Sequence, residues 1–132
     1  MVLTIDTSVL LAVLLEEPTK KRLVALTQGA DLQAPPSLHW ELGNVLSALM
    51  RRKRITSVQA KQVLAVYESI PIRFAEILLA DVIDIVGRHS IWAYDAYVID
   101  CARRYRTPML SLDKDQCRIA ELEGVQVIKV AK

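Results

Sequence analysis

The chain has little cysteine, glycine and phenylalanine, and each scarcity narrows the possible folds. Its 132 residues include two cysteines, four glycines and one phenylalanine. Two cysteines are too few for a disulfide scaffold, and the separation of Cys101 from Cys117 does not match the paired thiols of zinc sites. We therefore expect two reduced thiols packed in the fold.

Long hydrophobic runs and a strong charge of one sign are also missing. Asp6 interrupts the first apolar stretch and no basic leader precedes it, so we expect no signal peptide. The longest early apolar run, residues 9–15, is much shorter than the roughly 20 residues that cross a bilayer. We expect no membrane contact and, by default, a cytoplasmic protein. A formal net charge of +2 neither requires nor excludes a polyanionic partner.

Aliphatic residues dominate what is present. The chain is 52% hydrophobic and 24% charged, which is ample for one buried core, and its length is that of one domain. We expect a single domain over residues 1–132. Few glycines among many aliphatic residues are typical of helix-rich α/β domains rather than β-sandwiches. The mean hydropathy of +0.25 favours a dimer with a bound partner, since it indicates more apolar surface than a monomer leaves exposed.

Short apolar segments alternate with helical ones along the chain. The pattern predicts strands at residues 2–5, 32–34, 71–74, 108–111 and 125–128. It predicts helices at residues 9–16, 19–28, 38–52, 56–67, 75–88, 94–105 and 113–123. Such alternation indicates a three-layer α/β/α domain with a central parallel sheet. No strand separates the two helices between residues 37 and 67, so we expect these to form a helical hairpin beside the sheet.

Hydroxyl side chains mark the starts of three predicted helices. Ser8 or Thr7 is expected to cap the first helix and Ser37 the third, because serine and threonine accept hydrogen bonds from the free N–H groups of a first turn. Thr56 or Ser57 is expected to begin the fourth helix in the same way.

Two acids directly follow predicted strands. Asp6 comes after the strand at residues 2–5, and Asp113 comes after the apolar segment that ends at Leu112. Open α/β sheets bind their ligands at the carboxyl ends of the strands, so both acids are candidates for one site. A role as a helix cap is the alternative for each, since aspartate often caps helices.

Two further acids lie in line with the apolar faces of predicted helices. Asp95 shares its face with Ile99, and Glu41 shares its face with Val45. An acid in line with a core-facing stripe must cap, pair or bind a ligand. Taken singly, a hydrogen-bonded buried acid explains each of them as well as a functional site does.

Four carboxylates in one place would require cations. Two unit charges about 4 Å apart repel by ~1 kcal/mol in water and ~4 kcal/mol at an effective dielectric constant of 20. Mg²⁺ and Mn²⁺ are hard ions that prefer carboxylate oxygen. Neither His39 nor His89 sits at a convincing ligand spacing. The residues therefore suggest a Mg²⁺ or Mn²⁺ site built from four acids: Asp6, Glu41, Asp95 and Asp113.

The order of these motifs resembles PIN domains, and most of all the VapC-type toxins of bacterial and archaeal toxin–antitoxin pairs. The shared features are a strand ending in Asp-Thr-Ser-Val, Glu41 with Asn44 on one helix, the triplet Tyr94-Asp95-Ala96, and Ser111-x-Asp113. Together they cover essentially the whole chain. The resemblance implies a Mg²⁺- or Mn²⁺-dependent endoribonuclease that forms a homodimer and is neutralised by a small antitoxin protein.

The resemblance also implies roles for individual residues. The acidic cluster that catalyses cleavage would be Asp6, Glu41, Asp95 and Asp113. Polar side chains that orient a carboxylate or a water would be Thr7, Ser8, Asn44 and Ser111. Threonine is frequent in the family at the place of Ser111, which retains the hydroxyl. Asp115 is a candidate peripheral, water-mediated ligand, whereas Asp100 is expected to form a surface ion pair with Arg103 or Arg104.

Basic and aromatic side chains offer contacts for a partner. The densest basic run is Arg51-Arg52-Lys53-Arg54, and a smaller cluster comprises Arg103, Arg104 and Arg106. Such a run is either a solvated helix end, which the helix macrodipole favours, or a contact with RNA phosphates or an acidic antitoxin segment. Trp40, Trp92 and Tyr94 either stack on bases or fill a core or a dimer interface.

Three other functions compete with this interpretation. A phosphoaspartate hydrolase would use Asp6 as its nucleophile, but the haloacid dehalogenase-like proteins carry a second acid two residues later, where this chain has Ser8. A phosphate-receiver domain needs an acidic pair and a lysine after a late strand, and the chain lacks a convincing equivalent. A catalytically silent PIN-fold module that binds RNA or protein remains the main alternative, although the presence of all four acids argues against it.

Overall fold

The computed structural model describes residues 1–130, and a parallel sheet lies at its centre. Four strands hydrogen-bond in the order β3-β2-β1-β4, and every pairing is parallel. They are β1 (Val2–Ile5), β2 (Asp31–Ala34), β3 (Ile72–Phe74) and β4 (Met109–Leu110). Since β1 is an inner strand, the residues that follow it leave the sheet in the middle of its carboxyl edge.

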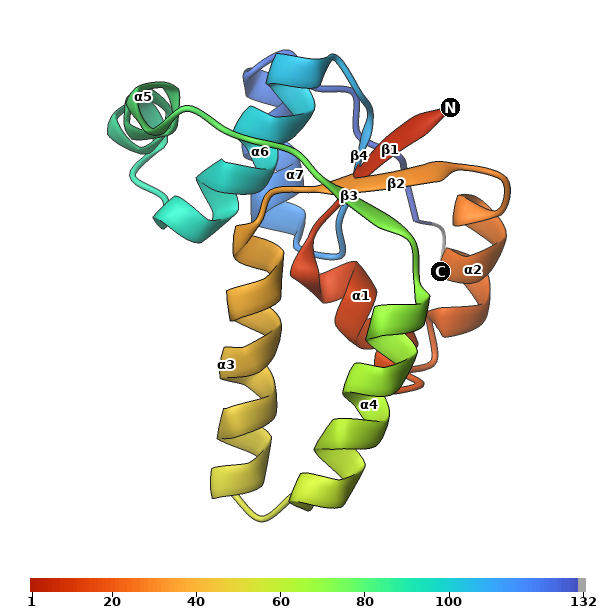
Figure 1. Ribbon diagram of the computed structural model, residues 1–132. Helices are drawn as coiled ribbons and strands as arrows, with labels where there is room; N and C mark the ends of the chain where they lie inside the picture. Colours follow the sequence, from red (N-terminus) through yellow and green to blue (C-terminus); the bar gives the residue numbers. More distant parts are fainter. Residues whose placement is uncertain (131–132) are drawn as a thin grey trace.

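Seven helices connect and cover these strands within residues 1–130 (Figure 1). They are α1 (Thr7–Leu14), α2 (Lys20–Thr27), α3 (Ser37–Arg51), α4 (Ser57–Ser69), α5 (Leu79–His89), α6 (Ala93–Tyr105) and α7 (Lys114–Leu122). In that part of the chain no helix combines the length and the apolar character that crossing a membrane would need.

The sheet separates two apolar clusters. Leu3, Ile5 and Leu110 pack against α1, α2, α3 and α4 in the first cluster. Met109 belongs to the second cluster, which lies among α5, α6 and α7. Neighbouring residues of a strand point to opposite faces, so Met109 and Leu110 supply one cluster each. These contacts confirm the predicted three-layer α/β/α fold, and α3 and α4 form the predicted helical hairpin (Figure 1).

Both cysteines are free thiols, as predicted. Cys101 is buried in α6, and burial raises the pKa of its thiol to about 11, so it stays protonated at neutral pH. Cys117 is partly buried in α7.

Two predictions of helix caps were wrong and one was right. Asp6, not Ser8 or Thr7, caps α1, because its extended backbone lets its carboxylate accept a hydrogen bond from Val9 N at 3.3 Å. Pro36 precedes α3, and Ser37 is the first helical residue, with a buried hydroxyl that has no partner in the described chain. Thr56 does cap α4, in a reciprocal capping box with Gln59.

The predicted last strand was also wrong. Residues 125–128 contribute only an isolated parallel bridge between Met109 and Val127. These residues do not form a strand because β4, the strand that they lie beside, has only two residues and offers little backbone to pair with.

Asp100 lies inside the protein rather than at its surface. Its side chain is 1% exposed and lies 3.6 Å from Arg104 Nε, so the predicted pairing with Arg104 forms, but at a buried carboxylate. Asp100 also accepts a hydrogen bond from Leu78 N at 3.3 Å. Because this bond and the one from Ala75 N to Ala34 O hold residues 75–78 in an irregular connection, α5 begins at Leu79 instead of residue 75.

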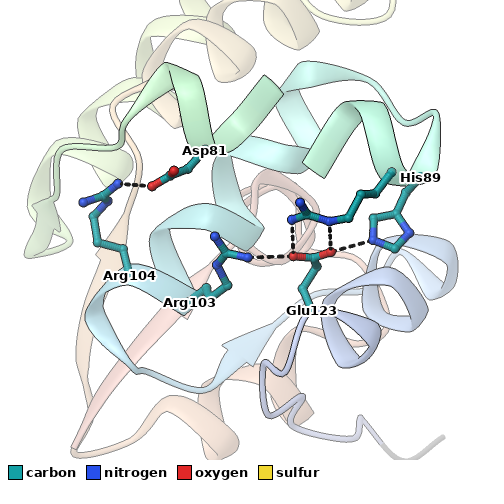
Figure 2. Close-up of polar contacts among 6 residues, drawn as sticks. Asp81, His89, Arg103, Arg104 and Glu123 are labelled. Carbon is teal, nitrogen blue, oxygen red and sulfur yellow. Dashed lines mark hydrogen bonds and ion pairs between the residues drawn. The ribbon is translucent and has the colours of Figure 1, made fainter. Parts of the chain in front are cut away.

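Glu123, just after α7, joins three helices through its carboxylate (Figure 2). It accepts hydrogen bonds from Arg88 at 2.7 and 2.9 Å, from His89 at 2.7 Å and from Arg103 at 2.8 Å. The hydrogen bonds from Arg88 have the largest effect on the pKa of Glu123. Together with the hydrogen bond from His89 and the charge of Arg103, they lower it to about 2. Arg103, which the sequence offered as a possible contact for a partner, is therefore paired with Glu123 within the fold.

The Glu123 contacts predict a loss of stability in acid. A pKa of about 2, below the ordinary 4.5, means that the ionised carboxylate stabilises the fold above pH 4.5 and that this contribution is lost as the pH falls toward 2. We expect Glu123→Gln to lower the free energy of unfolding at pH 7, because the ionised carboxylate that the arginines and His89 contact is lost. The loss should be only about 1–2 kcal/mol, because solvent screens the partly exposed arginines. Urea unfolding measures this, and equal stability of the two proteins at pH 7 would contradict the account.

Candidate active site

Asp6 is the most buried of the four predicted acids, with 7% of the residue exposed. Its Oδ1 accepts hydrogen bonds from Ser8 Oγ at 2.6 Å and Val9 N at 3.3 Å, and its Oδ2 accepts one from Ser111 Oγ at 2.9 Å. Burial is the largest influence on its pKa and raises it; these hydrogen bonds oppose the rise, and the charge of Asp113 adds to it. The fold thus holds both oxygens of a carboxylate that is costly to ionise.

The serine side chains connect Asp6 to the loop after β4. Ser8 Oγ accepts a hydrogen bond from Leu112 N at 3.0 Å, so it bridges α1 and this loop. Ser111 Oγ accepts one from Asp113 N at 3.0 Å. These contacts give Ser8 and Ser111 the positions expected of side chains that orient a carboxylate.

Gln116, on α7, is a buried member of this network that the sequence did not reveal. Its Oε1 lies 2.7 Å from Ser111 Oγ, and its Nε2 donates to the backbone oxygen of Asp95 at 3.2 Å. The Asp95 carbonyl fixes the orientation of the amide, so Oε1 must face Ser111. The single proton of Ser111 then has two acceptors, Gln116 and Asp6. A signal was present: an acid three residues before a glutamine at a helix start is close to a capping-box pattern.

Glu41 and Asp95 lie on two other helices, and Glu41 is close enough to interact with the charges of both Asp6 and Asp95. Glu41 is partly exposed in the first turns of α3, and burial raises its pKa to about 7; Thr7 opposes the rise, and the charges of Asp6 and Asp95 add to it. Asp95, in the first turn of α6, also has a raised pKa, first from burial and then from Asp113 and Asp115. The smaller contributions of neighbouring acids to both pKa values indicate that negative charge gathers between these helices.

Asp113 is exposed and caps α7. Its Oδ1 accepts hydrogen bonds from Asp115 N at 3.0 Å and Gln116 N at 3.1 Å. The alternative role as a helix cap is therefore real for Asp113, as it is for Asp6. Its charge nevertheless raises the pKa of Asp6 and of Asp95, so capping and membership of the acidic cluster coexist.

Not every expected supporting side chain takes part. Asn44 is exposed, and its amide makes no hydrogen bond with residues 1–130. Thr7 Oγ1 is buried and faces Glu41 without reaching the geometry of a hydrogen bond. Asp115 is exposed and pairs with Arg118 at 2.8 Å.

A hydrated divalent cation fits the donor set better than a fully coordinated one. Within residues 1–130, no three histidine, cysteine, aspartate or glutamate side chains converge closely enough to hold one ion. Mg²⁺ usually keeps several waters and binds proteins through one or two carboxylates. Carboxylates whose raised pKa values reflect burial and mutual repulsion suit such an ion in both charge and donor chemistry.

The pKa of Glu41 predicts how pH affects the metal-free protein. A folded-state pKa of about 7 means that protonated Glu41 contributes stability that is complete below pH 4.5 and lost as the pH rises through 7. In EDTA, Glu41→Gln should therefore be about 1–2 kcal/mol more stable than the wild type at pH 8, after allowance for solvent screening. The two should be alike at pH 4.5. Thermal unfolding measures both, and a difference that does not depend on pH would contradict the raised pKa.

Comparisons with known proteins give the family and the fold. The sequence profile of the PIN domain matches residues 3–122, whereas no curated protein sequence matches the chain significantly. VapBC2 from Rickettsia felis, solved bound to a DNA fragment from its promoter, is similar in structure: the TM-score is 0.69, the identity is 13%, and the match covers 97% of this chain and 98% of that one.

Two further solved structures share the fold. One is VapC20 from Mycobacterium tuberculosis, described as a sarcin-ricin loop cleaving toxin, with a TM-score of 0.63, 16% identity and coverage of 88% of this chain and 93% of that one. The other is FitAcB from Neisseria gonorrhoeae, with a TM-score of 0.61, 19% identity and coverage of 98% and 97%. At these identities the likeness establishes the fold, while the profile match spans most of the chain. The resemblance seen in the sequence is confirmed: this chain belongs to the PIN domain family.

Proposed function

We propose that this chain is a Mg²⁺- or Mn²⁺-dependent endoribonuclease that hydrolyses RNA phosphodiesters at its acidic cluster. The observation that carries the proposal is the coupling of four acids from four elements at the carboxyl edge of the sheet: Asp6, Glu41, Asp95 and Asp113. Membership of the PIN family supports it. A protein of the same fold, VapC20, is described as cleaving the sarcin-ricin loop.

Asp6 and Asp95 are the best candidates to hold the cation directly. Asp6 is held by three hydrogen bonds, and the Asp95 carboxylate makes no hydrogen bond or ion pair with the described residues, which leaves its oxygens free for a ligand. Glu41 and Asp113 would contact the cation through water. A divalent ion there would orient the phosphodiester and lower the pKa of a water molecule.

The protein's own residues supply position and a proton acceptor. Ser8 and Ser111 hold Asp6 in one orientation, so its carboxylate need not reorganise when substrate arrives. Glu41, with a pKa of about 7, exchanges a proton with water readily at neutral pH and is suited to accept one from the attacking water. Nothing in this hydrolysis requires the ribose 2′-hydroxyl, so a preference for RNA must come from contacts outside the carboxylates.

We also propose that the protein is the toxin of a toxin–antitoxin pair, acting as a cytoplasmic homodimer and neutralised by a small antitoxin protein. The similarity to VapBC2 supports this. A largely apolar groove of about 850 Å³ shares Ser111 with the site and is lined mainly by α7 and residues 127–130, including Leu122 and Ile128. An antitoxin segment in this groove would contact Ser111, which holds the Asp6 carboxylate. Leu79 and Ile83, both exposed on α5, are apolar side chains of the kind that a second copy would cover.

Replacing Asp6 by asparagine tests the proposed activity. We expect Asp6→Asn to lower Mg²⁺-dependent RNA cleavage by more than about 100-fold, since a cation ligand is lost. The fold should be retained, and it should be slightly more stable without metal, because a buried charge is removed. Cleavage of a labelled RNA and thermal unfolding measure the two effects.

Asp31→Asn is the matched control for this experiment. Asp31 is an exposed acid at the first residue of β2, at the opposite edge of the sheet, and its replacement should leave cleavage unchanged. Full activity of Asp6→Asn, or of the wild type in excess EDTA, would contradict the proposed function. RNA binding without any metal-dependent cleavage would support the alternative, a catalytically silent PIN-fold module.

A further inference from the structure

We propose that the exposed face of α3 binds single-stranded RNA and leads it to the carboxylates, an inference that rests on the proposed ribonuclease function. We call this surface the α3 track and define it by Trp40, Asn44, Ser47 and Arg51, together with residues 52–54 beyond the end of the helix. It would supply the contacts outside the carboxylates that a preference for RNA requires.

The helical repeat places these side chains on one side of α3. At 3.6 residues per turn, positions 40, 44, 47 and 51 fall within one narrow stripe, and all four residues are exposed. Leu38, Leu42 and Leu46 form the opposite, buried face. The stripe is about 16 Å long from Trp40 to Arg51, enough for several nucleotides of an extended strand.

Trp40 begins the track beside the acidic cluster. It directly precedes Glu41 and is 63% exposed. It takes part in no ring–ring contact within residues 1–130. An indole left in water is a platform on which a base can stack, and such stacking tolerates any sequence because every base has a π-face.

A surplus of positive charge lies at the far end of the track. Arg51, Arg52, Lys53 and Arg54 are exposed, and no acidic side chain of the described chain pairs with them. The carboxyl end of a helix carries a partial charge of roughly −0.5, which four cations greatly exceed. The remaining positive charge suits a row of phosphates.

The track suits a nucleic acid better than a second copy of the chain. Its centre consists of Asn44 and Ser47, with the exposed Gly43 beside them; these are small or polar, whereas the cores of protein interfaces favour aromatic and other large apolar side chains. Two copies meeting here would also bring eight like charges together. Large exposed aliphatic side chains are found on α5 instead, at Leu79 and Ile83.

Tryptophan fluorescence can report binding at Trp40 without any cleavage. The chain has two tryptophans, and Trp92, 83% exposed at the start of α6, is the other. In Trp92→Phe, with EDTA present, we expect a short single-stranded RNA to quench the emission of Trp40 saturably, and its duplex to do so weakly. Trp40→Ala in the wild-type chain should weaken binding of the labelled strand by about 5- to 100-fold, and Trp40→Phe should restore most of it.

The basic end of the track has a control of equal charge. Arg51→Ala/Arg54→Ala should reduce the slope of log Kd against log salt by about 1.4, the value expected for two lost phosphate contacts. Lys21→Ala/Arg22→Ala removes two exposed cations from α2 and should leave the slope unchanged. Lys53→Gly should weaken binding without loss of stability, since Lys53 has a φ of 57°, where glycine is favoured.

Each outcome decides the inference. Trp40 emission that does not respond to an RNA concentration that saturates binding would overturn it, as would equal losses in the α3 and α2 variants. Conversion of a dimer to a monomer by Trp40→Ala in sedimentation would show a contact between copies and also overturn it. If the wild type still shows Mg²⁺-dependent cleavage in these cases, the proposed ribonuclease function is retained and only the α3 track is rejected. Binding on the track without such cleavage would support the track and reject the ribonuclease.

Discussion

A carboxylate held out of water at the end of the central strand is the constraint on which the site depends. Asp6 leaves β1 in the middle of the sheet, with hydrogen bonds to both oxygens from Ser8, Val9 and Ser111. The strand order explains this arrangement, because β4 lies beside β1 and delivers Ser111 from 105 positions away in the sequence. Those bonds only partly oppose the effect of burial, so Asp6 remains costly to ionise without a cation.

The other acids of the cluster also raise one another's pKa values, so ionisation is costly along this whole edge of the sheet. Asp95 raises the pKa of Glu41, and Asp113 raises those of Asp6 and Asp95, although the four come from separate elements. A structural role alone would favour spreading these charges apart. Capping does explain part of the arrangement, since Asp6 and Asp113 each cap the helix that follows them. The two roles are compatible, because a carboxylate has oxygen lone pairs for both a backbone N–H and a cation.

Local periodicity was enough to predict the layers, the parallel sheet and the α3–α4 hairpin, because each rests on apolar spacing and on the order of elements. Some of the wrong predictions failed because a distant contact decided the outcome. The start of α5 depends on Asp100 accepting the N–H of Leu78, 22 positions away. Likewise, strand-end position indicated Asp6 and Asp113, whereas Gln116 joins the site only through contacts with Ser111 and Asp95. The exposure of Asn44 follows from the helical repeat, which places it opposite the buried face of α3 formed by Leu42 and Leu46.

The proposed function depends on this edge of the sheet binding a divalent cation, and calorimetric titration of Mn²⁺ into the metal-free protein tests this most directly. Carboxylates with raised pKa values give up protons when a cation binds. The account predicts saturable binding near pH 6.5 with a heat that depends on the ionisation enthalpy of the buffer, and much weaker binding by Asp6→Asn. Equal Mn²⁺ affinity in the wild type and in Asp6→Asn would contradict it.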